Sequence, residues 1–272
     1  MIAITLLSIA LILLVLLDAF EGMVLPRRVA RAYRPRRLFY LALWVPWSAV
    51  ARMAKTGGAR QLILAWFGPF SMLALFTFWA GILITSFALV NWSLAMPHTS
   101  TASSSLGTYV YFSGVTFFTL GFGDVTPISA LGRALAVFEA GVGFGFLAIV
   151  IGYVPAIQGV FSEREALISM LDARAGSPPV GSQILIRMAR SGSLHALDSF
   201  LGEWERWCAK LLESVISFPV LGYYRSQHDN QSWLASLTAI LDACALSIAG
   251  ATGTNTYQVQ VTFAMARHAA VD

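Results

Sequence analysis

Residues 119–124 read Thr-Leu-Gly-Phe-Gly-Asp, and this TLGFGD segment has the residue types of a backbone that coordinates cations. Gly121 and Gly123 alternate with bulky residues, and glycine adopts positive φ angles at little steric cost. Where every second residue has that freedom, consecutive carbonyl groups can turn to one side of the chain. The resulting ladder of oxygens can replace the hydration shell of a cation. Asp124 would place a carboxylate, which favours cations, at the mouth of the ladder.

The residues just before the TLGFGD segment predict the element that positions it. Residues 109–118 are apolar and aromatic, but a helix needs about 20 apolar residues to cross a bilayer core. We therefore expect a short helix within the membrane, with the negative end of its dipole directed at the glycines. Unwound backbone at membrane depth is tolerated only where it is buried in protein or lines an aqueous path. This arrangement therefore indicates a pore.

Charge and hydropathy place the segment in a membrane. Only 12% of the 272 residues are charged and the mean hydropathy is +0.69, which excludes an ordinary soluble enzyme and a disordered tail. Residues 61–123 contain no Asp, Glu, Lys or Arg. We predict three spans: a retained anchor at residues 2–17, an outer helix at 70–96 that follows the helix-breaking pair Gly68-Pro69, and an inner helix at 134–158.

The basic residues predict the orientation of these spans. Residues 21–60 carry nine basic residues against the single acid Glu21, and short loops rich in Lys and Arg stay in the cytoplasm. The N-terminus is then outside and the C-terminus cytoplasmic. Residues 38–53, interrupted by Pro46, are expected to lie in the membrane interface. The basic cluster sets topology and is also a candidate site for anionic lipid, through Arg27, Arg28, Arg31, Arg34, Arg36 and Arg37.

The TLGFGD segment resembles the selectivity filter of potassium channels, whose usual form is Thr-Val-Gly-Tyr-Gly-Asp. The likeness extends over about residues 61–161, in the order outer helix, pore helix, filter, Pro127, inner helix. It implies a bacterial channel of the plasma (inner) membrane with K⁺ as the permeant ion. A carbonyl cage needs four filter segments and each chain supplies one, so we expect a homotetramer. The implied ligands of K⁺ are the backbone carbonyls of Thr119, Leu120, Gly121 and Phe122, with the Thr119 hydroxyl.

Three residues depart from the usual filter pattern: Leu120 replaces Val, Phe122 replaces Tyr, and Phe118 stands where a second Thr is common. Phe122 lacks the hydroxyl that could brace the filter from behind. Three functions therefore stay open: a potassium-selective channel, a weakly selective cation channel, and a membrane-anchored helical sensor or scaffold with a non-conducting pore. The sequence has no enzyme motif, so we expect no catalytic residues, no cofactor besides the permeant K⁺ and no nucleic-acid partner.

Residues of the inner helix are candidates for gating. By resemblance, Gly143 lies near the hinge glycine of the inner helix, while glycine at this position also permits close helix packing, so both roles stay open. Pro155 favours a bend because it removes a backbone hydrogen bond. Below it, Phe161 is large enough to close the path by dewetting. No span carries repeated arginines, which excludes a voltage-sensing helix.

Glu139 is the one acid inside the predicted inner helix. Ionisable residues within a membrane usually face protein or water. Three positions stay open for Glu139: buried in protein, where it braces the pore helix or the filter; facing a cavity as a cation site; or reaching the interface.

The C-terminal third is expected to be a helical cytosolic region. Ser162 and Glu165 form a capping-box pattern that predicts the start of a new helix, and a linker rich in Gly and Pro follows at 176–182. Further helical patterns cover 233–248 and 257–270, and the chain stops at Asp272 without a C-cap, as in a chain incomplete at that end. Apolar residues at steps of three and four indicate a helix–helix seam, within the chain or as a tetramerising coiled coil: Leu194, Leu197, Leu201, Trp204, Cys208, Leu211 and Val215.

Together these features predict an all-α membrane protein. Its expected parts are a transmembrane anchor at 1–20, a basic cytosolic or interfacial segment at 21–60, a pore module at 61–161 and a helical cytosolic domain at 162–272. Cys208 and Cys244 have no metal-ligand spacing around them, and we expect buried thiols rather than a disulfide.

Overall fold

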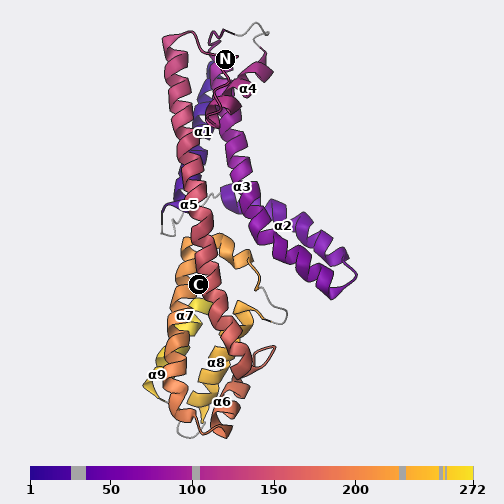
Figure 1. Ribbon diagram of the computed structural model, residues 1–272, viewed down its shortest axis with the longest axis vertical. Helices are drawn as coiled ribbons and strands as arrows, with labels where there is room; N and C mark the ends of the chain where they lie inside the picture. Colours follow the sequence, from indigo (N-terminus) through magenta and orange to yellow (C-terminus); the bar gives the residue numbers. More distant parts are fainter. Residues whose placement is uncertain (26–34, 100–104, 227–230, 251–253, 255, 272) are drawn as a thin grey trace. The chain divides into compact units, whose positions relative to one another are not determined.

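A computed structural model describes residues 1–25, 35–99, 105–226, 231–250, 254 and 256–271 (Figure 1). Within these residues 83% of the structure is helical and no β-strand is present, which confirms the predicted all-α fold class. Three helices are long and apolar enough to cross a membrane: α1 (Ile2–Met23), α3 (Gly57–Ser93) and α5 (Ala130–Ala175). They contain the predicted spans 2–17 and 134–158 and most of the span 70–96, whose last three residues lie beyond the end of α3 at Ser93. The short helix α4 (Leu106–Phe117) lies between α3 and α5 in the sequence, where the pore helix was expected.

Several expected helix ends are wrong. Pro46 lies inside α2 (Pro35–Met53), Pro69 lies inside α3, and α5 continues through the Ser162–Glu165 pattern to Ala175. An interior proline removes one backbone hydrogen bond, but neighbouring helices and local adjustment can satisfy the freed carbonyl. Ser162 caps nothing, because the preceding turn of α5 already supplies carbonyl acceptors for the N–H groups that a cap would bind.

The described residues form two compact units, with the boundary inside α2, α3 and α5. Unit 1 comprises residues 1–46 and 69–155, and unit 2 comprises residues 47–68 and 156–272. The four predicted segments divide the chain by membrane topology rather than by contacts, so they stay a prediction.

In unit 1, α1 packs along α3 (Figure 1). The indole Nε1 of Trp79 on α3 donates to Asp18 Oδ2 on α1 at 3.2 Å, and both side chains are buried. Near the other end of α1, the hydroxyls of Thr5 and Ser93 lie 2.7 Å apart. The anchor helix is therefore joined to the outer helix by polar contacts as well as by apolar surface.

Unit 2 holds the C-terminal helices: α6 (Gly181–Arg190), α7 (Leu197–Ser217), α8 (Trp233–Ala249) and α9 (Tyr257–Val271), with short 3₁₀ turns η1 (Leu194–Ala196) and η2 (Pro219–Tyr223). The predicted seam on α7 is buried against α8 and α9 of the same chain, which supports the intrachain packing alternative. Its buried members are Leu197, Leu201, Trp204, Cys208 and Leu211.

Arg164, just past the predicted inner span, connects α5 to η2 within unit 2. Its side chain is only 5% exposed and donates to the carbonyls of Leu221 at 3.2 Å and Tyr224 at 3.1 Å. It also forms a buried ion pair with Glu165 at 3.2 Å. The indole of Trp207 on α7 donates back to the Arg164 carbonyl at 3.2 Å. The C-terminal region therefore holds α5 at Arg164, through bonds to both its guanidinium group and its backbone carbonyl.

The two cysteines are free and buried, as expected. Burial raises the pKa of the Cys208 thiol and of the Cys244 thiol to about 12. Both side chains therefore stay protonated at neutral pH, and the thiolate is the form that reacts with alkylating reagents.

We expect native Cys208 and Cys244 to react with iodoacetamide at pH 8 far more slowly than the same residues in the unfolded chain. The measurement is mass spectrometry of the labelled protein against time. A variant with Ala209→Cys, on the exposed face of α7, supplies the positive control. Equal labelling rates at the introduced thiol of this variant and at the two native cysteines would contradict the buried positions.

Candidate functional site

The backbone of the TLGFGD segment alternates in handedness. Positive φ angles occur at every second residue: 56° at Thr119, 61° at Gly121 and 79° at Gly123. This is the alternation that the glycine spacing predicts. A Cβ atom built on Gly121 or Gly123 would meet nothing within 4 Å, so the left-handed backbone and not a lack of space requires glycine there.

The carbonyl groups of this segment are available to a ligand. The N–H groups of Thr119 and Leu120 donate back to the last turn of α4, to Thr116 at 3.0 Å and Val115 at 2.9 Å. Among the described residues, no hydrogen bond reaches the carbonyls of residues 119–122. Their oxygens therefore keep free lone pairs, and a row of such oxygens has the chemistry to coordinate cations.

Side chains of the segment are uncovered within one chain. Leu120 is 56% exposed, Phe122 66% and the preceding Phe118 42%. Large apolar side chains with this exposure need another surface to cover them. Within the described residues of one chain, these side chains stay largely uncovered.

Contacts at its N-terminus and along one buried face hold the pore helix α4. At its N-terminus the Ser105 hydroxyl accepts from the N–H of Thr108 at 3.4 Å. Its buried face consists of Tyr109, Ser113 and Phe117, which follow one another at intervals of four residues. The Tyr109 hydroxyl donates to the carbonyl of Met96, which follows α3, at 2.9 Å. The helix that precedes the TLGFGD segment is thus held by contacts to other parts of unit 1.

The outer mouth of the segment is held by residues that sequence reasoning did not identify. The Tyr111 hydroxyl on α4 donates to Asp124 Oδ2 at 2.8 Å. The N–H of Thr99 donates to the Thr126 carbonyl at 2.9 Å, next to an isolated β-bridge between His98 and Pro127. Tyr111 therefore holds the TLGFGD segment through a hydroxyl hydrogen bond to Asp124. Phe122 has no hydroxyl group and cannot form such a bond. The only signal of Tyr111 in the sequence is a hydroxyl-bearing aromatic residue on the predicted pore helix.

Gly143 on the inner helix lies directly against the end of the pore helix. A Cβ at this position would lie 1.9 Å from the carbonyl oxygen of Phe117, the last residue of α4. The neighbouring Gly141 and Gly145 have nothing within 4 Å of the corresponding positions. The packing alternative for Gly143 therefore has direct structural support, while its role as a hinge stays a prediction.

Glu139 lies one turn before Gly143 and is fully buried, with 0% of its surface exposed. Its Oε1 is in hydrogen-bond contact with the Ser113 hydroxyl on α4. This position agrees with the protein-buried alternative rather than with a cavity or the interface.

The gating roles of Pro155 and Phe161 stay predictions. Pro155 lies within a continuous helix. The Phe161 side chain is only 6% exposed and packs in unit 2 against the ring of Tyr224, at 5.5 Å between centroids, and beneath the guanidinium of Arg164, at 5.0 Å. Its position therefore gives no support to a role as a hydrophobic gate.

The predicted lipid site lies largely outside the described residues, which exclude Arg27, Arg28, Arg31 and Arg34. The Arg36 side chain is half-buried in unit 1 beside Gly22, where an added Cβ would meet its guanidinium at 2.1 Å. Binding of anionic lipid stays a prediction. No cluster of His, Cys, Asp and Glu suited to a metal ion occurs among the described residues.

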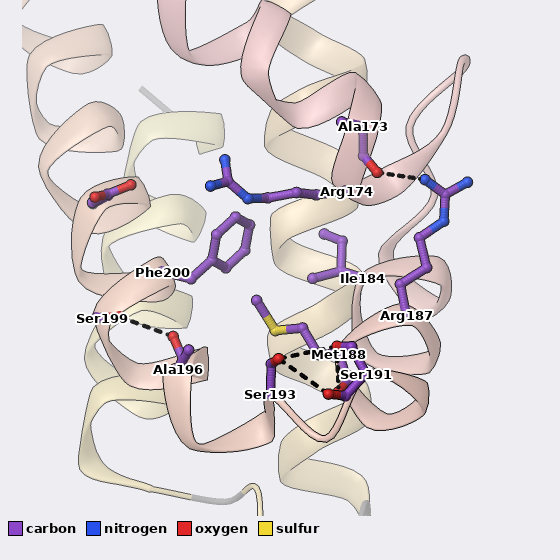
Figure 2. Close-up of a pocket in the computed structure, with 11 residues that line it drawn as sticks. Ala173, Arg174, Ile184, Arg187, Met188, Ser191, Ser193, Ala196, Ser199 and Phe200 are labelled. Atoms are coloured by element: carbon purple, nitrogen blue, oxygen red, sulfur yellow. Dashed lines mark hydrogen bonds between the residues drawn. The ribbon is translucent and has the colours of Figure 1, made fainter.

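Unit 2 contains a cavity of about 460 Å³ between the end of α5, α6 and the start of α7 (Figure 2). Ile184, Met188 and Phe200 supply its apolar surface. Arg187 donates to the Ala173 carbonyl at 2.6 Å, and the Ser191 hydroxyl donates to the carbonyl of Met188 at 3.1 Å. The cavity has room for a small organic molecule, but these polar groups already bind partners in the same chain.

Comparison with known proteins agrees with the geometry. Residues 71–157 match a family model described as "Ion channel", and this region includes most of α3, all of α4, the TLGFGD segment and the first part of α5. The chain is 24% identical over 194 residues to the "Uncharacterized membrane protein YdjJ" of Bacillus subtilis (strain 168), a match that covers 69% of this chain and 55% of the relative. The chain thus spans about half the length of this curated relative. No solved structure gives a significant match.

These findings support an ion channel located in a membrane. An ion-channel domain indicates a transport protein rather than an enzyme. The matched region contains the TLGFGD segment and the helices that hold it.

Because Gly143 touches the end of the pore helix, Gly143→Ala should shift α4 and distort the TLGFGD segment. We expect the variant to lose ion flux and about 2 kcal/mol of stability, the usual cost of an extra methyl group in a packed site. Flux is measured in vesicles and stability by thermal unfolding. Gly141→Ala is the matched control, since a Cβ there meets nothing within 4 Å. Equal effects of the two substitutions would refute the contact as the cause.

Proposed function

We propose that the protein is a homotetrameric, potassium-selective channel that conducts K⁺ passively through the TLGFGD segment. The observation that carries the proposal is the run of unpaired carbonyls at residues 119–122 on a backbone with positive φ at Thr119, Gly121 and Gly123. Carbonyl oxygens are the ligands that K⁺ filters use to replace water. The ligands of the ion would be the carbonyls of Thr119, Leu120, Gly121 and Phe122, with the Thr119 hydroxyl.

One-sided coordination of the ion and uncovered apolar surface in a single chain both support assembly into a tetramer. A ladder of carbonyls from a single chain reaches only one side of an ion, whereas a dehydrated cation needs oxygens around it. The most apolar window of α5 is only 17% buried, against 50% for α3. The inner helix and the exposed residues Leu120 and Phe122 therefore have surface for neighbouring copies of the chain to cover. Fourfold symmetry places four equal segments around one axis.

The same proposal includes the location and orientation of the chain. The basic residues between 21 and 60 support a cytoplasmic position for that segment, with the N-terminus outside and the C-terminal helices in the cytoplasm. The membrane would be the plasma membrane of a bacterium.

The test is ion flux into vesicles that contain the purified protein. We expect Rb⁺ and K⁺ to enter at least about tenfold faster than Na⁺, which corresponds to about 1.4 kcal/mol of discrimination. Native mass in nanodiscs should be that of four chains. Equal entry of Na⁺ and K⁺ would favour a weakly selective cation channel. The replacement of the usual filter residues by Phe118 and Leu120 would then contribute to the low selectivity. Absence of flux from an intact tetramer would favour a scaffold with a non-conducting pore.

Gly121→Ala should abolish flux without loss of the tetramer. Alanine disfavours the φ of 61° at this position, and the open space around Gly121 means that the added methyl group itself causes no clash. Flux and native mass are measured on the same preparation. Gly81→Ala on α3, where the helix has ordinary φ and a Cβ meets nothing within 4 Å, should leave both unchanged. A conducting Gly121→Ala channel would rule out the backbone as the ion site.

A further inference from the structure

A buried carboxyl group takes part in the contact that joins the three helices around the TLGFGD segment. Glu139 on α5 contacts Ser113 on α4, and both residues are 0% exposed. The Ser113 hydroxyl also lies 2.7 Å from the backbone carbonyl oxygen of Ile84 on α3. One hydroxyl group thus connects the outer, pore and inner helices.

Counting the hydrogens that Ser113 and Glu139 can donate indicates whether the Glu139 carboxyl group is protonated. A serine hydroxyl has one hydrogen to donate. The Ile84 carbonyl can only accept, so the hydrogen of Ser113 is used there. Ser113 Oγ and Glu139 Oε1 can then share a hydrogen bond only if the carboxyl group donates it. The other carboxyl oxygen, Oε2, is buried without a hydrogen-bond partner among the described residues, which is costly for a charged carboxylate.

Among the described residues, no cationic group is recorded as a partner of Glu139. Residues 61–123, which include the α3 span and all of α4, contain no charged side chain, and the nearest charged residues along α5 are Arg133 and Glu163. The titratable side chains of α4 are Tyr109 and Tyr111, whose hydroxyls donate to Met96 and Asp124. An ionised carboxylate in this setting would be a buried charge without a partner, so the neutral form is the one that the surroundings accept.

The contact is one of several that set α4 on α5, together with the approach of Gly143 to Phe117 and the ring contact between Phe117 and Phe146. Glu139 and Gly143 are one turn apart on α5, and their partners Ser113 and Phe117 are one turn apart on α4. Phe117 ends α4, two residues before Thr119. The two contacts together determine where the pore helix ends and where the TLGFGD segment begins.

We propose that Glu139 is protonated and donates a hydrogen bond to Ser113, and that this bond positions the end of the pore helix and hence the first residues of the filter. Glu139 is a positioning residue and binds no permeant ion. The consequence for flux rests on the proposed function, whereas the location of the proton does not.

Infrared difference spectroscopy of the full chain in lipid vesicles at neutral pH tests the proton directly. The parent protein should show a C=O stretching band of a protonated carboxyl group, and Glu139→Gln should remove it. Ser113→Ala should shift the band, because the acceptor is lost. Glu163→Gln, which replaces an exposed carboxylate paired with Lys210, should change only carboxylate bands. The proposal is overturned if the parent spectrum contains no protonated-carboxyl band that Glu139→Gln removes.

Flux of the same variants tests the positioning role. Glu139→Gln keeps a donor on a side chain of equal length, so we expect K⁺ flux within about twofold of the parent and an unchanged preference for K⁺ over Na⁺. Glu139→Met has a similar length but no donor, and we expect about tenfold lower flux, the equivalent of one lost hydrogen bond. Equal loss in the Gln and Met variants would overturn the role of the donated bond. Should the Met variant fail to assemble, Ser113→Ala provides the same comparison with Gln.

The two proposals fail in distinguishable ways. A parent protein that shows the band but conducts no K⁺ would contradict the proposed function and support the assignment of the proton. A conducting parent without the band would support the function and refute the proton on Glu139.

Discussion

The rest of the structure depends on one constraint: the backbone of residues 119–122 is unwound between helices that are long and apolar enough to cross a membrane. Its carbonyls have no hydrogen-bond partner among the described residues of the chain. In a helix or a sheet each of these groups would be satisfied locally, and in lipid an unsatisfied group is costly. The segment is therefore tolerable only if protein surrounds it and a ligand or water satisfies the oxygens. An ion path formed by several copies of the chain meets both requirements.

The surroundings of the segment hold it from both sides. Before it, α4 is set on α5 by the Ser113–Glu139 and Phe117–Gly143 contacts, which fix the point where the helix ends. After it, Tyr111 holds Asp124 and the residues beyond are bonded to the loop that follows α3. Neither set of contacts touches the carbonyls themselves. The backbone is thus positioned while its oxygens stay free.

Much of the fold was predictable because local physical chemistry decides it. Long apolar runs require helices in a membrane, and the repeat of three and four on α7 requires a helix with one buried face. Local signals failed where tertiary or helical context outweighed them. Pro46, Pro69 and the Ser162–Glu165 pattern were expected to end or begin helices, and each lies inside one. A helix that already extends on both sides of such a residue has hydrogen bonds and packing to offset the local cost.

The sequence by itself determined the type of backbone at residues 119–123, because positive φ at alternate residues is a property that Gly121 and Gly123 carry locally. It also determined which segments are long and apolar enough to span a membrane. Only the tertiary structure decided that Gly143 packs against the pore helix. The contacts of Tyr111 with Asp124 and of Glu139 with Ser113 are likewise visible only there. These pairs are separated by 26 residues for Gly143–Phe117, 13 for Tyr111–Asp124 and 26 for Ser113–Glu139. Their contact depends on where and at what rotation the helices cross, which no local pattern specifies.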